Sequence, residues 1–244
     1  MPEREMSFLD HLEELRIRIL ISIVAILVVT LIAMVFSDDI LNLLLIPSGG
    51  LRLKAFNLMD GFMIKFRLSL YLGIAAAFPI WAFQLYRFIM PGLLDHERRT
   101  IFPALVASSL LFALGVGFGY YLLHEMIQVL VMIFPSQVDF LPAADEYISF
   151  VVFFLVSCGL AFQLPILLTL LIQLRVLSVD LLKKQRRIAY FILFVFAELV
   201  TPVADPILAP MLIMLPLFFL YEASILVGAR LEVRNTGPSS LTTG

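Results

Sequence analysis

Cysteine, histidine and charged residues are all scarce in this sequence. The single cysteine, Cys158, excludes an intramolecular disulfide and a cysteine-rich metal site. The only histidines are His11, His96 and His124, and no Walker-type glycine loop occurs, so we expect no metal, no nucleotide and no other cofactor. The net charge of -2 gives no basic field for nucleic acid, and we therefore exclude nucleic acid as a partner.

Apolar residues fill the chain instead. Hydrophobic residues make up 61% of the sequence and charged residues 15%, against roughly a quarter charged in a soluble domain. The mean hydropathy is +1.02. A soluble fold of this length would need many more polar residues on its surface. The composition therefore predicts an integral membrane protein built almost entirely of transmembrane helices.

Apolar runs long enough to cross a bilayer recur along the sequence. A helix needs about 20 apolar residues to cross roughly 30 Å of hydrocarbon. We predict an all-α polytopic protein with six transmembrane helices, the last two of them short. They form a single membrane domain over residues 1–228, which is followed by a polar cytoplasmic tail, 229–244. The predicted helices cover residues 17–36, 68–90, 101–123, 148–174, 188–203 and 207–227.

Lysine and arginine are divided unevenly between the two sides of this arrangement, and this division predicts the orientation. One side carries 13 of them and the other carries 4. The loop over residues 124–147 contains none, as expected of an exported loop. Both termini are therefore predicted to be cytoplasmic. The exceptions on the exported side all lie in the first loop, and they are Arg52, Lys54, Lys65 and Arg67.

The two longer exported loops contain apolar residues as well as turn residues. Residues 38–47 predict a short amphipathic helix that begins with two aspartates, where carboxylates complement the helix dipole. The second loop is also apolar and is broken by Pro135 and Pro142. We expect the two loops to pack on each other as an outer cap. The alternative is two flexible loops that lie on the lipid headgroups.

Three polar segments stand beside the apolar runs. Residues 8–16, FLDHLEELR, precede the first predicted helix, and residues 88–99, FIMPGLLDHERR, follow the second. The last hairpin, 201–222, contains a Thr-Pro pair, an aspartate and a glutamate. With six helices and an inside N-terminus, these segments resemble the TatC family, the signal-peptide-binding core of the twin-arginine protein translocase. The resemblance extends over nearly the whole chain, residues 8–227.

The resemblance implies a receptor rather than a pore or an enzyme. A TatC protein binds the twin-arginine signal peptides of folded cargo proteins and recruits single-span partners of the TatA and TatB type. It is expected to be homo-oligomeric within the complex and to depend on the proton-motive force. The resemblance also places the chain in the lipid bilayer of a bacterial or archaeal cytoplasmic (inner) membrane, as a multi-pass protein with a concave shape.

Carboxylates in the first two polar segments suit the recognition of arginine. A carboxylate accepts two parallel N–H bonds from the planar fork of a guanidinium. By the resemblance, Glu14 and Glu97 correspond to the two family glutamates implicated in binding the arginine pair. The alternative is that these carboxylates are solvated or capping groups paired with neighbouring arginines. The other residues assigned to the predicted signal-peptide site are Arg16, Phe88, Pro91, His96, Arg98 and Arg99.

Polar side chains in or near the predicted helices form a second candidate set, because an ionisable group inside a bilayer is costly and marks function. The family carries a glutamate in the fourth helix, where this sequence has Gln163, which can hydrogen-bond to a partner helix but cannot carry a proton. Glu198 is the candidate to take over part of that role. The alternatives are a local hydrogen bond for Gln163 and an interfacial position beside Arg230 for Glu222. The partner-helix set comprises Gln163, Glu198, Asp205 and Glu222.

Two other classes of function predict features that can be looked for in the sequence. A small-solute or ion secondary transporter would contain inverted repeats and helices broken at mid-membrane. No repeat relates the two halves of this sequence, and its charges cluster at the predicted cytoplasmic surface. An intramembrane enzyme would need a Ser/His, paired-Asp or His-rich constellation within the bilayer. The three histidines all lie near the predicted water boundary.

Overall fold

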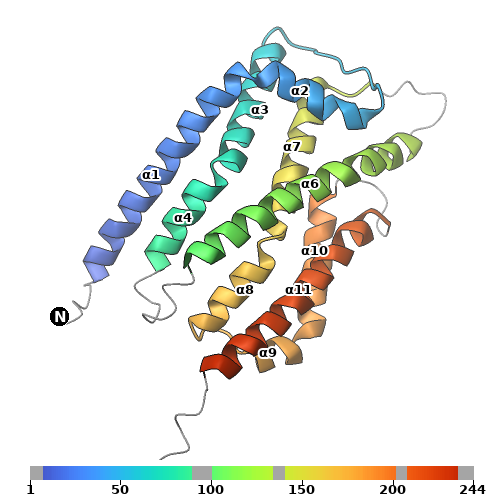
Figure 1. Ribbon diagram of the computed structural model, residues 1–244. Coiled ribbons are helices and arrows are strands. Elements are labelled where there is room, and N and C mark those ends of the chain that lie inside the picture. The colour runs from blue at the N-terminus through green and yellow to red at the C-terminus, as the bar shows by residue number, and fades with distance from the viewer. Residues whose placement is uncertain (1–7, 90–100, 134–140, 202–207, 236–244) are drawn as a thin grey trace, which may run out of the picture. The chain divides into compact units, whose positions relative to one another are not determined.

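The computed structural model describes residues 8–89, 101–133, 141–201 and 208–235, and these residues are almost entirely helical (Figure 1). One isolated bridge between Lys54 and Ala143 is the single β-type pairing among them. The chain divides into two compact units, residues 1–109 with 141–156 and residues 110–140 with 157–244. Each unit is described by itself.

The first unit contains the helical elements from α1 to α4. The helix α6 begins in this unit and ends in the second, and so does α7. The helical elements concerned are α1 (Phe8–Val35), α2 (Ser37–Leu45), η1 (Ile46–Ser48), α3 (Asp60–Ala76), α4 (Phe78–Ile89), α6 (Ile101–Ile133) and α7 (Ala144–Ala161). The second unit adds α8 (Leu164–Gln173), α9 (Val179–Lys184), α10 (Arg186–Val200) and α11 (Leu208–Asn235).

Several of these helices are long and apolar enough to cross a membrane, so the chain is a polytopic membrane protein. Four such spans lie in the described part of the chain, and a bent pair of helices, α3 and α4, can form a fifth. Of the two helices predicted to be short, α10 has 15 residues and is shorter than any of the four, whereas α11 has 28 residues, so the prediction was wrong for the last helix. The six-helix count and the cytoplasmic position of both termini stay predictions. The four spans are Leu9–Val35, Phe102–Met132, Ala144–Gln173 and Pro210–Arg230.

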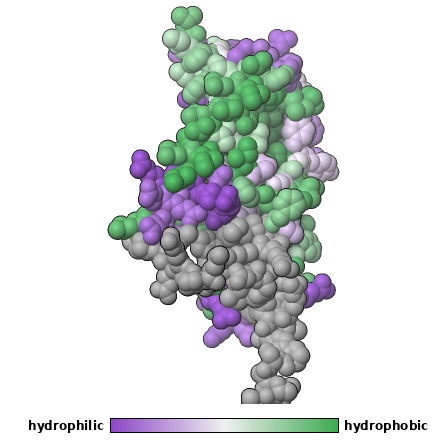
Figure 2. All heavy atoms as spheres, turned by 60° about the vertical axis from the view of Figure 1, so that its left-hand side comes forward, coloured by the Kyte–Doolittle hydropathy of each residue, from purple (hydrophilic) through white to green (hydrophobic). Residues whose placement is uncertain are grey.

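The outward side of α1 is strongly apolar. Only 11% of its most hydrophobic window is buried inside the protein. Figure 2, which brings the α1 side forward, shows a broad hydrophobic surface. Side chains such as Val24 and Leu31 are 58% and 67% exposed, as suits a helix that faces lipid. The helix also begins at Phe8, before the predicted start at residue 17, and Asp10 in its first turn complements the helix dipole.

The predicted second helix, 68–90, is broken into two helices that are bent by 48° at Ala77. Pro79 follows the break and has no N–H to donate, which interrupts the helical hydrogen-bond ladder. The indole Nε1 of Trp81 donates to the carbonyl oxygen of Ile74 at 3.0 Å. This side-chain bond satisfies a backbone acceptor at the bend, as a backbone break within a membrane requires.

The predicted fourth helix, 148–174, is likewise two helices, α7 and α8. The break follows Ala161, and Pro165 lies in the first turn of α8, where a missing N–H costs least. Gln163 is the residue that directly precedes α8. A proline in an apolar run therefore marks the interruption in both broken helices.

The two predicted exported loops contact each other within the first unit. The backbone N–H of Lys54 donates to the carbonyl oxygen of Pro142 at 3.1 Å, and the N–H of Ala144 donates to the carbonyl oxygen of Lys54 at 2.8 Å. The hydroxyl of Tyr147 donates to the carbonyl oxygen of Leu44 in α2 at 3.0 Å. The described parts of the loops therefore form a packed cap rather than two independent loops. Pro135 lies outside the described residues.

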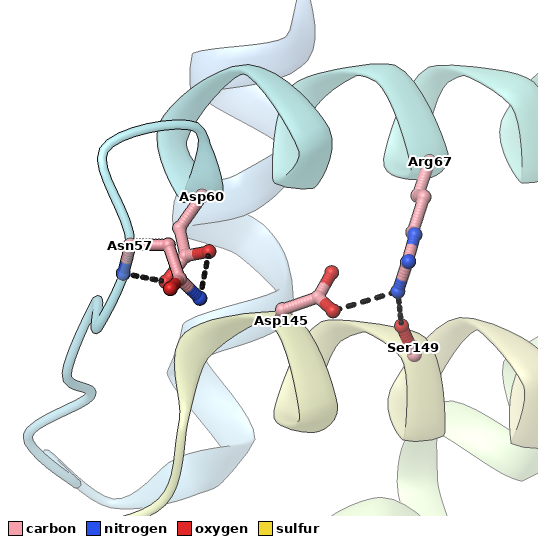
Figure 3. Close-up of polar contacts among 5 residues, drawn as sticks. All are labelled: Asn57, Asp60, Arg67, Asp145 and Ser149. Carbon is pink, nitrogen blue, oxygen red and sulfur yellow. Dashed lines mark hydrogen bonds and ion pairs between the residues drawn. The ribbon is translucent and has the colours of Figure 1, made fainter.

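Ion pairs tie this cap to the helices below it. Lys65 contacts Asp38 at 2.7 Å, and Arg67 contacts Asp145 at 2.6 Å. Figure 3 shows Arg67 of α3 reaching the first turns of α7, where Ser149 also lies 3.5 Å from its Nη1. Two of the four basic residues that depart from the charge pattern are therefore each paired with an aspartate from another segment.

The carboxylate of Asp60 organises the turn that leads into α3. It accepts hydrogen bonds from the backbone N–H group of Phe56, at 2.7 Å, and from that of Asn57, at 2.9 Å, the second of which is drawn in Figure 3. The side-chain amide of Asn57 donates to it as well. The backbone hydrogen bonds lower the pKa of Asp60, because they favour the charged carboxylate. The bond from Asn57 has the larger effect and the bond from Phe56 the smaller one.

This lowered pKa predicts the pH dependence of the turn. The contribution of Asp60 is complete above the ordinary aspartate pKa of about 3.9 and is lost as the pH falls through the lower folded value. We expect the backbone amide NMR signals of Phe56 and Asn57 to shift on acidification with a midpoint below that ordinary value. The Asp60→Asn variant should show no such titration, and a midpoint at or above 3.9 would contradict the expectation.

Candidate functional site

Glu14 lies near the N-terminal end of α1, where it is held by a bridge to α4. The Arg18 guanidinium donates from Nη2 to Glu14 Oε1 at 3.0 Å and from Nη1 to Gln84 Oε1 at 3.2 Å. Glu14 and Arg18 are four residues apart, so they are neighbours on one face of the helix. Gln84 belongs to α4, and Arg18 therefore links the carboxylate of one helix to the amide of another.

A second contact between the same two helices lies on the other side of Glu14. The rings of His11 and Phe88 are stacked, with their centroids 4.3 Å apart and an interplanar angle of 14°. His11, Glu14 and Arg18 follow each other at spacings of three and four residues, which places them on the same face of α1. The carboxylate is thus framed by an aromatic stack towards the N-terminus and by the arginine bridge towards the helix interior.

The polar atoms in this frame are not all paired. The Glu14 and Arg18 side chains are 19% and 18% exposed. Within the described residues, Glu14 Oε2 and Arg18 Nε are buried and have no hydrogen-bond partner. A buried polar atom without a partner costs about 1–3 kcal/mol, and more when it is charged. A donor that reaches Glu14 Oε2 would therefore be bound favourably.

The other predicted signal-peptide residues divide into described and undescribed ones. Phe88 is part of the frame around Glu14. Arg16 is exposed, and its separation of two residues from Glu14 points it to another face of α1. The structure thus gives Arg18, at i+4, as the arginine that contacts Glu14. The remaining predicted residues lie outside the described part of the chain, and they are Glu97, Pro91, His96, Arg98 and Arg99.

Arg18 and Gln84 are site contacts that the sequence interpretation did not single out. Two signals in the sequence point to them. Arg18 follows Glu14 at the spacing of a helical ion pair, and Gln84 interrupts an otherwise apolar run. An amide in such a run needs a hydrogen-bond partner, and Gln84 is 9% exposed. The partner itself is a matter of how α1 packs on α4.

In the second unit, Glu222 is fully engaged by α10. Its Oε2 accepts from Arg186 Nη2 at 2.7 Å, and its Oε1 accepts a short hydrogen bond from the Tyr190 hydroxyl. The adjacent Tyr221 donates to the carbonyl oxygen of Leu182 at 2.9 Å. The basic residue that contacts Glu222 is thus Arg186, and not Arg230 as in the alternative considered for this glutamate. This cluster fastens α11 to α10 and α9.

The other predicted intramembrane residues have different surroundings. The Gln163 side chain donates to the carbonyl oxygen of Gly159 at 3.5 Å, which is the local hydrogen bond considered above. Glu198 is exposed on α10, beside the outward-facing side chains of Val195 and Leu199. Asp205 lies outside the described residues. Among the residues that the structure describes, no group of histidine, cysteine and acidic side chains is arranged to hold a metal ion.

Comparison with known proteins adds evidence that is independent of this geometry. The family model described as Sec-independent protein translocase protein (TatC) matches residues 10–216. The chain is 33% identical over 230 residues to the Sec-independent protein translocase protein TatC of Carboxydothermus hydrogenoformans, covering 93% of this chain and 94% of that protein. It is also 33% identical to TatCy of Bacillus subtilis, over 93% of this chain and 90% of that protein.

Solved structures agree with the sequence relatives. A crystal structure of the twin-arginine translocase receptor TatC superimposes with a TM-score of 0.78 at 34% identity, covering 91% of this chain and 99% of that chain. A second crystal structure of this receptor, in DDM, gives a TM-score of 0.79 at 34% identity. The match covers nearly all of both chains in sequence and in fold, and the chain belongs to the TatC family of Sec-independent protein translocase proteins.

Proposed function

We propose that the framed carboxylate of Glu14 binds one arginine of a twin-arginine signal peptide. The observation that carries the proposal is the buried oxygen Oε2 of Glu14, which has no hydrogen-bond partner among the described residues, while Arg18 contacts Oε1. The geometry supports an anionic acceptor that is held in place before the peptide arrives. A guanidinium matches such an acceptor better than an ammonium does, because it presents several N–H donors in one plane.

Glu97 is proposed as the second carboxylate. It follows the last residue of α4, Ile89, by eight positions in the sequence. An extended chain covers about 3.5 Å per residue, so eight residues give ample reach back to the Glu14 frame. Because Phe88 stacks on His11, the chain leaves α4 next to α1. Two carboxylates at this end of the helices would suit two consecutive arginines.

The wider role follows from the family. As a subunit of a Sec-independent translocase, the protein serves transport of proteins rather than catalysis of a reaction. We propose that both termini lie in the cytoplasm, that the membrane is the cytoplasmic (inner) membrane, and that transport draws on the proton-motive force. Single-span partners of the TatA and TatB type would dock on the α10–α11 hairpin. The exposed Glu198 on α10 and the hydrogen-bonding capacity of Gln163 support polar contacts with such helices.

The proposal predicts strong effects of single carboxylate changes on peptide binding. We expect Glu14→Gln and Glu97→Gln each to weaken binding of a twin-arginine peptide about 10- to 100-fold, the equivalent of one charge-assisted hydrogen-bonded contact. Binding to the detergent-solubilised full chain measures this directly. A peptide with both arginines replaced by lysine should bind correspondingly more weakly to the unmodified protein.

Glu13→Gln provides the matched control. Glu13 is exposed and is adjacent to Glu14 in sequence, so this variant removes the same charge from another face of α1. It should leave peptide affinity within about twofold, since an exposed charge is largely screened. Equal binding of both peptides to every variant would make the acidic residues structural, and would reopen the question of what this surface binds.

A further inference from the structure

The bridge that links Glu14 to α4 has a consequence for how an arginine is recognised. Arg18 uses two of its nitrogens, and each contacts an oxygen of a different helix, Glu14 Oε1 on α1 and Gln84 Oε1 on α4. Its third nitrogen, Nε, is buried without a partner among the described residues. Arg18 is therefore placed by its two acceptors and not by a complete set of hydrogen bonds.

We propose that Arg18 and Gln84 are positioning residues, which hold Glu14 Oε1 on the α4 side and leave Oε2 as the oxygen that accepts from an incoming guanidinium. This inference rests on the proposed function, in which Glu14 contacts the signal peptide. The carboxylate group is planar, so fixing one oxygen fixes the direction of the other. Gln84 matters because, without it, Arg18 would be free to follow the Glu14 side chain into other rotamers.

Simple electrostatics predicts the opposite effect for Arg18. A positive charge 3.0 Å from Glu14 repels a cationic peptide, so its removal alone would tighten binding. If Arg18 positions Glu14, its removal instead weakens peptide binding, because the carboxylate is no longer held in the orientation that matches a guanidinium fork. The sign of the change in affinity therefore distinguishes the two accounts.

A substitution at Gln84 can test the effect of orientation without the effect of charge. Gln84 is neutral and buried on α4, and it contacts Arg18, which in turn contacts Glu14. Replacing it with leucine removes the acceptor without changing any charge. Replacing it with glutamate keeps an acceptor at the same place, and a charge-assisted bond to Arg18 is stronger than the original one.

The test measures dissociation constants of a twin-arginine peptide and of its twin-lysine counterpart with the detergent-solubilised full chain. For Arg18→Gln and Gln84→Leu we expect the affinity for the arginine peptide to fall about tenfold, the effect of one misplaced charged hydrogen bond. The affinity for the lysine peptide should change much less, so the preference for arginine shrinks. Gln84→Glu should retain the preference of the unmodified protein, because it keeps an acceptor for Arg18.

Arg87→Gln is the matched charge control. Arg87 is exposed near the end of α4 and lies 5.9 Å from the Phe83 ring, so its removal takes one positive charge from the same end of the helix without touching the bridge. It should bind the arginine peptide as tightly as the unmodified protein or slightly more tightly. Thermal unfolding of each variant in detergent shows whether the fold is retained, and Gln84→Leu serves the test if Arg18→Gln fails to fold.

Three outcomes are distinguishable. The positioning role is supported if the preference for the arginine peptide is lost in Arg18→Gln and Gln84→Leu but retained in Gln84→Glu. Unchanged or tighter arginine-peptide binding in both variants overturns it, while loss of binding in Glu14→Gln still upholds the proposed function. If Glu14→Gln also binds normally, then the proposed site fails and the positioning role fails with it.

Discussion

Gly115→Val is expected to prevent the second unit from folding. A Cβ atom at Gly115 would lie 2.6 Å from the carbonyl oxygen of Cys158 and 2.9 Å from the Cα of Gly159. Both of these atoms belong to the backbone of α7, so no side-chain rotation relieves the contact. Overpacking costs about 1–3 kcal/mol when side chains can adjust, and we expect the upper end of this range or more where two helices must separate.

The same helix supplies the control for this prediction. A Cβ atom at Gly117 has nothing within 4 Å, so Gly117→Val makes the same chemical change two residues away in open space. We expect Gly117→Val to give a normal yield of monodisperse protein in gel filtration and a normal unfolding temperature in detergent. Gly115→Val should give little or no such protein. Equal behaviour of the two variants would contradict the close approach of α6 and α7.

Gly73→Ala is expected to have the second large effect, by forcing α3 away from α1. A Cβ atom there would lie 2.0 Å from Thr30 Oγ1 and 3.0 Å from the carbonyl oxygen of Ile26. The hydroxyl of Thr30 is buried and has no hydrogen-bond partner within the described residues. The shortest contact is therefore with a side chain that makes no bond, and the longer ones are with the backbone of α1.

This difference allows a double-mutant test. Thr30→Ala alone should cost little, and the Gly73→Ala, Thr30→Ala pair should recover most of the unfolding temperature that Gly73→Ala loses. A coupling of about 1–3 kcal/mol between the two sites is expected for residues in direct contact. Gly61→Ala on the same helix, where a Cβ has nothing within 4 Å, is the control. Additive effects of the two substitutions would show that the clash lies elsewhere.

Much of the helical membrane architecture could be predicted from the sequence, because apolar runs long enough to cross a bilayer are visible in the residue types alone. The interruptions of α3–α4 and α7–α8 could not. Proline within an apolar run is tolerated as a kink or as a full break, depending on what satisfies the freed backbone groups. At the first break, the indole of Trp81 satisfies one of these backbone groups, because it donates to the carbonyl oxygen of Ile74, seven residues earlier in the chain. Such a contact depends on three-dimensional placement and leaves no periodic signal.

The candidate site was predictable in part for a similar reason. Glu14 and Phe88 belong to segments whose residue types resemble those of the family, and the structure places both in one frame. Arg18 and Gln84 are 66 positions apart in sequence, and they meet only because α1 contacts α4. Which polar residues meet across two helices depends on their relative rotation, and hydropathy alone does not determine that rotation.

Broken helices were also a feature expected of the alternative, a secondary transporter. One sharp break is present, at Ala77, while the shorter interruption after Ala161 lies within the single span Ala144–Gln173. The feature is therefore shared between classes of membrane protein, and it does not discriminate between them. The match to TatC proteins over nearly the whole chain decides the class.

The ion pairs of the cap also bear on how the protein is made. Lys65 finds its partner, Asp38, on a segment that is synthesised before it. Arg67 is paired with Asp145, which is 78 residues further along the chain. At a synthesis rate of about 5–20 residues per second, Arg67 waits for roughly 4–16 seconds until its partner emerges. The ion pair between α3 and α7 therefore forms only after α7 has been synthesised, whereas the pair between Lys65 and α2 needs no later segment.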